Sequence, residues 1–154
     1  MQTAVITVSS SLARGEGEDV SGPRLAALAR AAGADVVAQE VVADDRGAIE
    51  QRLRAHVEAG VAFVLTTGGT GLTPDDVTPE ATRAVIERDA PGFAEAMRVE
   101  GARHTPLGIL TRGVSGVAGR TLIVNFPGSP RAIDQLFPVL APTLRHVTET
   151  LRRN

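Results

Sequence analysis

The sequence predicts an α/β fold with three layers, in which helices cover both faces of a mostly parallel sheet that contains one antiparallel strand. Three strand-like runs, at residues 3–8, 36–43 and 61–65, alternate with segments whose apolar residues have helical spacing. Such alternation is typical of parallel strands joined by right-handed crossovers. At 154 residues the chain has the length of one compact domain, so we assign residues 1–154 to a single domain.

The first two strand and helix units follow directly from turn and cap residues. The strand at residues 3–8 runs into a polar loop, and the helix after it has Pro23 in its first turn and Gly33 at its end. The second strand, residues 36–43, precedes a helix at residues 47–59. The third run is β-branched and aromatic, as expected for a strand buried on both faces.

The second half of the chain has a different pattern. Residues 80–88 and 93–103 have helical spacing and predict two helices with a break between them. Residues 113–120 and 121–126 predict two short strands around a glycine turn. One of these strands is expected to run antiparallel, at or near the edge of the sheet.

Composition excludes several classes of function. The net charge is -2, the arginines are scattered and aromatic residues make up 3% of the chain, so we expect no nucleic-acid partner. No apolar run approaches membrane-spanning length and the N-terminus has no secretory pattern, which predicts no membrane partner and a cytoplasmic location. The chain has no cysteine, and all 16 basic residues are arginine. Thiolate nucleophiles, Schiff-base chemistry and a lysine-bearing phosphate loop are therefore excluded.

A glycine-rich loop directly follows the third strand. Thr67, Gly68, Gly69, Thr70 and Gly71 place backbone N–H groups and hydroxyls where a ligand can approach closely. The loop matches neither common nucleotide fingerprint, since the third glycine of G-x-G-x-x-G is missing and there is no G-K-[ST]. Ligands of open α/β sheets bind beyond the carboxyl ends of the strands. We therefore expect this loop to bind a phosphate or a pterin-like ligand.

Two aspartates follow strand ends on the same side of the predicted sheet. Asp44 comes after the second strand and Asp76 lies at the rim of the glycine loop. Both side chains could face one cleft and hold Mg²⁺ against a triphosphate. Loops are also rich in aspartate for local reasons, so spacing alone leaves both interpretations open, whereas Asp45 and Asp75 are taken as ordinary loop residues.

A second tight loop opens the last helical region. Asn125, Pro127, Gly128 and Ser129 end the predicted strand, with Ser129 as helix cap, and a helix N-terminus of this kind can donate N–H groups to an anion. Arg112 either pairs with a phosphate or is a solvated charge at the sheet edge. Pro138 and Pro142 interrupt the segment that follows, so we expect a kink or break before the last helix.

The histidines give no metal signal. His56, His104 and His146 lie far apart in the sequence without metal-ligand spacing. All three are predicted to be surface residues.

Taken together, these motifs resemble the molybdopterin-binding family of molybdenum cofactor biosynthesis, of the Mog and MoaB type of molybdopterin adenylyltransferase. The resemblance covers essentially the whole chain and is specific only when its motifs are combined. The matching segments are Gly17, Asp19, Ser21, Gly22 and Pro23, then Val42, Ala43 and Asp44, then Thr67 to Gly71 with Asp76 to Glu80, and finally Leu110, Thr111 and Arg112, Gly119, Arg120 and Thr121, and Asn125 to Pro130.

The resemblance implies a reaction in which ATP and molybdopterin give adenylyl-molybdopterin and pyrophosphate, with Mg²⁺. On this reading Asp44 and Asp76 are catalytic, and Asp44 is the metal ligand. Thr111 and Arg112, with the two glycine-containing loops, bind substrate. The family also implies a homotrimer or a larger homo-oligomer. Phosphoryl transfer needs positioning and charge neutralisation more than a covalent nucleophile, which suits a chain without Cys or Lys.

The chain departs from the family pattern at Ser10, where an acidic residue is common, and at Asp75, where a basic residue usually precedes the second aspartate. Asp75 places a negative charge beside a site for polyanions. Two alternatives to the enzyme therefore stay open. One is a non-catalytic molybdopterin-binding module, and the other is a nucleotide-binding domain of the competence-damage type with the same fold.

Overall fold

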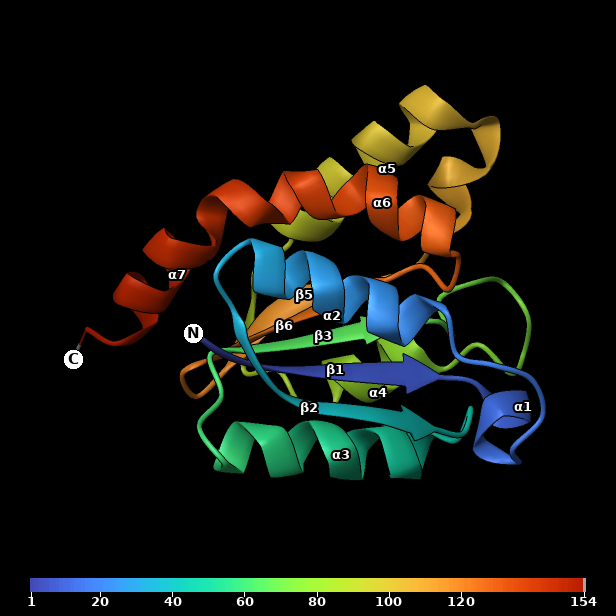
Figure 1. Cartoon of the computed structure of the whole chain (residues 1–154), viewed down its shortest axis with the longest axis horizontal. Coiled ribbons are helices and arrows are strands. Elements are labelled where there is room, and N and C mark those ends of the chain that lie inside the picture. The colour runs from blue at the N-terminus through green and yellow to red at the C-terminus, as the bar shows by residue number, and fades with distance from the viewer. Residues whose placement is uncertain (154) are drawn as a thin grey trace.

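The computed structural model of this chain describes residues 1–153 (Figure 1). Asn154, the last residue of the predicted domain, lies outside the described residues. Within residues 1–153, six strands form one sheet in the order β2-β1-β3-β6-β5-β4. The strands are β1 (Gln2–Val8), β2 (Asp35–Val42), β3 (Phe63–Thr67), β4 (Arg88–Asp89), β5 (Ser115–Ala118) and β6 (Thr121–Phe126). Strands β2, β1, β3 and β6 are parallel neighbours, whereas β5 runs antiparallel to β6 and β4.

Helices cover both faces of this sheet, which confirms the predicted three-layer α/β class (Figure 1). Helices α2, α5 and α6 pack on one face, and α3 and α4 pack on the other. No helix in the described part of the chain is long and apolar enough to cross a bilayer. The helices are α1 (Ser10–Ala13), α2 (Ser21–Ala31), α3 (Arg46–Glu58), α4 (Thr78–Arg83), α5 (Gly92–His104), α6 (Pro130–Leu140) and α7 (Leu144–Leu151), with 3-10 helices η1 (Pro106–Leu110) and η2 (Ala141–Thr143).

Strand β1 shows how the sequence builds the two cores. Successive side chains of a strand point to opposite faces. Val5 packs with Leu25 of α2, and Ile6 packs with Ile49 of α3; all four side chains are at most 1% exposed. Burying a side chain of this kind stabilises the fold by about 1.5–3 kcal/mol. The apolar runs at the start of the chain are therefore explained by burial on both faces.

The helix predicted at residues 80–88 is shorter in the structure. Helix α4 ends at Arg83, and Arg88 and Asp89 form the edge strand β4 instead. These two residues pair with Val117 and Gly116 of β5. Sheet pairing with a distant segment overrides the local helical spacing here. The predicted break near Pro142 is confirmed, since η2 separates α6 from α7.

The prediction of a surface position was wrong for His56. Its side chain is buried, with 7% of the residue exposed, and its Nε2 lies 2.7 Å from Oε1 of Glu40. Arg52 Nε donates to the same carboxylate at 3.1 Å. Partial burial of Glu40 raises its pKa, but the hydrogen bonds from Arg52 and His56 outweigh that effect and hold the pKa below its ordinary value. The cluster joins α3 to β2, a partnership that sequence spacing does not reveal.

Glu40→Gln should lower the free energy of unfolding by about 1 kcal/mol at neutral pH, because it weakens the charge-assisted hydrogen bonds to Arg52 and His56. Since the folded-state pKa of Glu40 lies below the ordinary value of 4.5, this stabilisation is present above that pH and is lost as the pH falls through the lowered pKa. Urea denaturation of both proteins across this range measures the difference. Glu50→Gln, which removes a more exposed pair with Arg46, is the control and should have a smaller effect. A deficit that persists unchanged in acid would contradict the assignment.

Candidate functional site

The two predicted loops meet at the carboxyl ends of β3 and β6. These strands pair in parallel, with Thr67 opposite Phe126. Gly68 N donates a hydrogen bond of 3.1 Å to Phe126 O. The Thr67 hydroxyl donates to Pro127 O at 2.7 Å. The glycine loop and the loop before α6 are therefore fastened to each other.

Glycine is required where the chain crosses itself at this edge. Gly68 has φ +98°, and a Cβ there would lie 2.4 Å from Val8 O at the end of β1. Gly69 has φ +68°, and a Cβ there would lie 2.3 Å from the Thr78 hydroxyl. Both positions exclude other residues by conformation and by contact. A Cβ on Gly128 would lie 3.3 Å from Gly68 Cα, so the two loops also pack closely.

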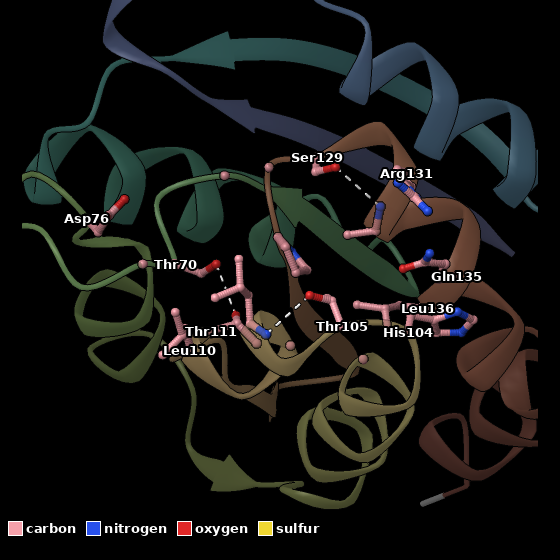
Figure 2. Close-up of a pocket in the computed structure, with 18 of the residues that line it drawn as sticks. Thr70, Asp76, His104, Thr105, Leu110, Thr111, Ser129, Arg131, Gln135 and Leu136 are labelled. Atoms are coloured by element: carbon pink, nitrogen blue, oxygen red, sulfur yellow. Dashed lines mark hydrogen bonds between the residues drawn. The ribbon is translucent and has the colours of Figure 1, made fainter.

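A hollow of about 730 Å³ opens at this edge of the sheet (Figure 2). Asp76 lies at its rim, and Thr111 donates a hydrogen bond of 3.1 Å to the Thr70 hydroxyl within it. Most of the predicted substrate-binding residues are therefore brought together. The two loops contribute Gly68, Gly69, Thr70 and Gly71, and Pro127, Gly128 and Ser129.

The opposite wall of this hollow was missed by the sequence analysis. It comes from the C-terminal end of α5, from η1 and from one face of α6. The α6 residues lie one helical turn apart and so share one face of the helix. The predicted helix start at Pro130 could therefore have been used to identify this face from the sequence. The main side chains of this wall are His104, Leu107, Leu110, Arg131, Gln135 and Leu136.

A second hollow of about 450 Å³ adjoins the first. Gly68 and Gly128 line both, so their contact separates the two. Ser9, Asp19 and Ser21 supply polar groups to the second hollow. Ser21 donates to Gly128 O at 2.6 Å, which ties the start of α2 to the same contact. Two adjoining hollows are suited to two ligands that react with each other.

Asp44 and Asp76 lie against the same glycine loop but from different segments. Asp76 Oδ2 accepts from Thr73 N at 3.0 Å and lies 2.7 Å from where a Cβ of Gly71 would be. Asp44 Oδ2 accepts from Ser10 N at 2.8 Å, and its Oδ1 lies 3.3 Å from the corresponding position of Gly69. Asp76 lines the larger hollow, whereas Asp44 lines neither of the two hollows, so the expectation that both side chains face one cleft is not met.

These carboxylates fit a cation that brings its own phosphate ligands. In residues 1–153 there is no group of three or more His, Asp or Glu side chains that could hold a metal ion. Oδ1 of Asp44 and Oδ1 of Asp76 accept no hydrogen bond from the described residues. Mg²⁺ is commonly held by one or two carboxylates together with substrate phosphates. The donors present match that pattern.

The Arg112 side chain cross-links the glycine loop to Glu80 of α4. Its Nε donates to Gly71 O at 2.8 Å, its Nη2 donates to Asp76 O at 2.7 Å, and its Nη1 donates to the Glu80 carboxylate. The hydrogen bond from Arg112 lowers the pKa of Glu80, and the same bond raises the pKa of Arg112. The guanidinium is thus committed to protein groups, which neither of the two sequence interpretations anticipated.

Asn125 is likewise committed to the protein interior. Only 1% of the surface of Asn125 is exposed. Its Nδ2 donates to the hydroxyls of Thr66 and Thr82 at 3.0 Å, and its Oδ1 accepts from Val114 N at 3.1 Å. The side chain joins β6 to β3, α4 and the start of β5, and it does not line the hollow. Asn125 therefore positions the loop and its amide does not reach the hollow.

Comparison with known proteins gives a family for this site. Residues 4–146 match the family model described as "Probable molybdopterin binding domain". Over 138 residues the chain is 39% identical to the molybdopterin adenylyltransferase of Haemophilus influenzae, covering 88% of this chain and 70% of that protein. Over 149 residues it is 36% identical to the molybdenum cofactor synthesis protein cinnamon of Drosophila melanogaster, covering 96% of this chain but 25% of that protein.

Solved structures give the same result. A structure of MogA superposes with a TM-score of 0.92 at 41% identity, covering 98% of this chain and 99% of the other. The molybdopterin biosynthesis enzyme MoaB of Thermus thermophilus superposes with a TM-score of 0.91 at 40% identity, covering 97% and 95%. CinA of Thermoplasma acidophilum, at 22% identity and a TM-score of 0.69 over 96% of this chain and 99% of its own, shares the fold alone. The chain therefore belongs to the molybdopterin-binding domain family of Mog and MoaB proteins.

Proposed function

We propose that this protein is a molybdopterin adenylyltransferase of molybdenum cofactor biosynthesis, which transfers the adenylyl group of ATP to molybdopterin with Mg²⁺ and releases pyrophosphate. The observation that carries the proposal is the pair of hollows that adjoin at the contact of Gly68 with Gly128. A reaction between two substrates needs two sites that meet at the reacting atoms. The names of relatives such as the Haemophilus influenzae enzyme support the same reaction.

In this mechanism molybdopterin occupies the larger hollow and the nucleotide occupies the smaller one. A terminal phosphate oxygen of molybdopterin forms a bond to the α-phosphorus of ATP, the bond from that phosphorus to the bridging oxygen breaks, and pyrophosphate leaves. Backbone N–H groups of residues 69–71 and of the loop before α6 orient the phosphates, while the Gly68 N–H is bonded to Phe126 O. Closely packed walls hold the two substrates in line, which supplies much of the rate enhancement in phosphoryl transfer.

Asp44 and Asp76, which approach the glycine loop at Gly69 and at Gly71, would each supply a carboxylate oxygen to Mg²⁺ bound together with the substrate phosphates. When bound, the ion neutralises phosphate charge and so favours attack by one anion on another. Asp76 also keeps its loop in place through Thr73. Neither residue is needed as a nucleophile.

A second candidate function is binding of molybdopterin without adenylyl transfer. Asp75 leaves this function open, because this exposed carboxylate adds negative charge beside Asp76, where the transferase would have to bring two polyanions together. Incubation with ATP, Mg²⁺ and molybdopterin separates the two functions: pyrophosphate release supports the enzyme, and tight binding without release supports the module. A homotrimer or larger homo-oligomer remains a prediction from the resemblance, and a cytoplasmic location remains a prediction from the sequence pattern.

Asp44→Asn and Asp76→Asn should each lower the rate of pyrophosphate release on the order of 100-fold, because each removes a negative charge next to the proposed metal and phosphates. Both residues are partly exposed, and asparagine can still accept the hydrogen bonds from Ser10 and Thr73, so the melting temperature should change little. Asp75→Asn, on the exposed neighbour, is the matched control and should keep the rate or raise it. Variants with full activity, or with inactivity explained by unfolding, would refute the catalytic roles.

Arg112→Ala should loosen the glycine loop, since the loop carbonyls of Gly71 and Asp76 lose their common donor. We expect faster amide hydrogen exchange at residues 70–76 and unchanged exchange in α2, measured by mass spectrometry. The KM for molybdopterin should rise with it. Arg88→Ala removes a comparable contact to a backbone carbonyl, Gly119 O, at the far edge of the sheet. If both variants leave exchange at residues 70–76 as in the wild type, Arg112 does not hold the glycine loop in place.

A further inference from the structure

The face of α6 that lines the larger hollow carries polar groups that the protein itself does not use. Arg131 and Gln135 lie one turn apart on this face, and both line the hollow. Within residues 1–153 neither side chain makes a hydrogen bond or ion pair with another protein group. Gln135 is nevertheless partly buried. A partly buried amide without protein partners is satisfied by water or by a ligand.

The other predicted polar contacts are already occupied. Arg112 is committed to the glycine loop and Glu80, and Asn125 is committed to Thr66 and Thr82. The Thr67 hydroxyl is committed to Pro127 O. Because these groups are committed, a ligand that enters the hollow finds its available amide at Gln135.

Gln135 lies on the side of the hollow away from the glycine loop. Figure 2 shows Gln135, Leu136 and His104 together on that side, opposite Asp76 and Thr70. Leu136 is 3% exposed and offers an apolar surface. His104 is held by Glu100, with Nε2 3.0 Å from Oε1. This side therefore combines the apolar side chain of Leu136 with the Gln135 amide, while the exposed Arg131 guanidinium lies one turn away. An apolar surface with an amide beside it is suited to the face and polar edge of a flat heterocycle.

The chemistry of molybdopterin gives the orientation. Its phosphate lies at one end and its pterin ring, with an edge of neighbouring N–H and C=O groups, lies at the other. If the phosphate reacts beside Asp76 and the glycine loop, the ring extends toward α6. A glutamine amide carries a donor and an acceptor side by side, so it can pair with such an edge through two parallel hydrogen bonds.

We propose that Gln135 is a specificity-determining residue that pairs with the amide edge of the substrate's pterin ring, while Leu136 packs on the ring. This inference rests on the proposed function for the identity of the substrate, but it concerns ring recognition and is independent of adenylyl transfer. Gln135 acts on binding of the ring and takes no part in the chemical step.

The test uses Gln135→Leu, which keeps the size of the side chain and removes both polar atoms, and Gln135→Glu, which keeps acceptors and removes the donor. Gln51→Leu, at an exposed position of α3, is the matched control. The first probe is pterin without a phosphate. Its binding is measured from the change in pterin fluorescence as protein is added. Loss of the paired hydrogen bonds should weaken pterin binding roughly 10-fold in both Gln135 variants, and should leave Gln51→Leu unchanged.

Turnover supplies the second readout. In the pyrophosphate assay Gln135→Leu should raise the KM for molybdopterin by a similar factor, with kcat and the KM for ATP nearly unchanged, because ring binding is lost equally in the ground and transition states. A protein that binds pterin through Gln135 but releases no pyrophosphate would contradict the proposed function and keep this inference. Wild-type binding of pterin and molybdopterin by both Gln135 variants would overturn the inference, whether or not the protein turns over.

Discussion

The fastening of β3 to β6 at their carboxyl ends is the constraint on which the rest of the site depends. Gly68 comes so close to Val8 O that a Cβ would lie at 2.4 Å, and its N–H bonds to Phe126 O. The carboxyl ends of three parallel strands, β1, β3 and β6, thus approach one another at Gly68, with no side chain between them. Any larger residue at Gly68 would have to displace backbone, since both its positive φ and its contacts exclude a Cβ.

This close approach explains the form of the site. The contact of Gly68 with Gly128 separates the two hollows, so both ligands would meet at two glycines that have no side chains. The polar side chains nearest to it serve mainly to hold it: Thr67 reaches Pro127, Arg112 reaches Gly71 and Asp76, and Asn125 reaches Thr66 and Thr82. Thr66, Thr67, Thr82 and Asn125 are buried, and a buried polar network whose members are all satisfied fixes one loop conformation. Backbone N–H groups, preorganised in this way, are suited to bind phosphate without reorganising.

Much of this arrangement could be predicted from the sequence, because glycines and strand ends report backbone geometry directly. The layer order, the glycine loop, and the meeting of the two loops at one edge follow from residues such as Gly68 and Gly128. The partners of side chains do not follow, because they come from residues far along the chain. Asn125 next to a glycine turn has the same local sequence whether it faces a ligand or Thr82, and His56 has the same helical spacing whether it is exposed or paired with Glu40. The α6 wall was missed for a similar reason, since Gln135 gains its meaning only from the hollow it borders.

A crystal structure with molybdopterin and a non-hydrolysable ATP analogue would decide whether the two hollows hold the two substrates. We expect one ligand in each hollow, with their phosphates approaching each other at the contact of Gly68 and Gly128 and within reach of Asp44 and Asp76. Density that places both ligands in the same hollow, or either one at a different edge of the sheet, would contradict this expectation.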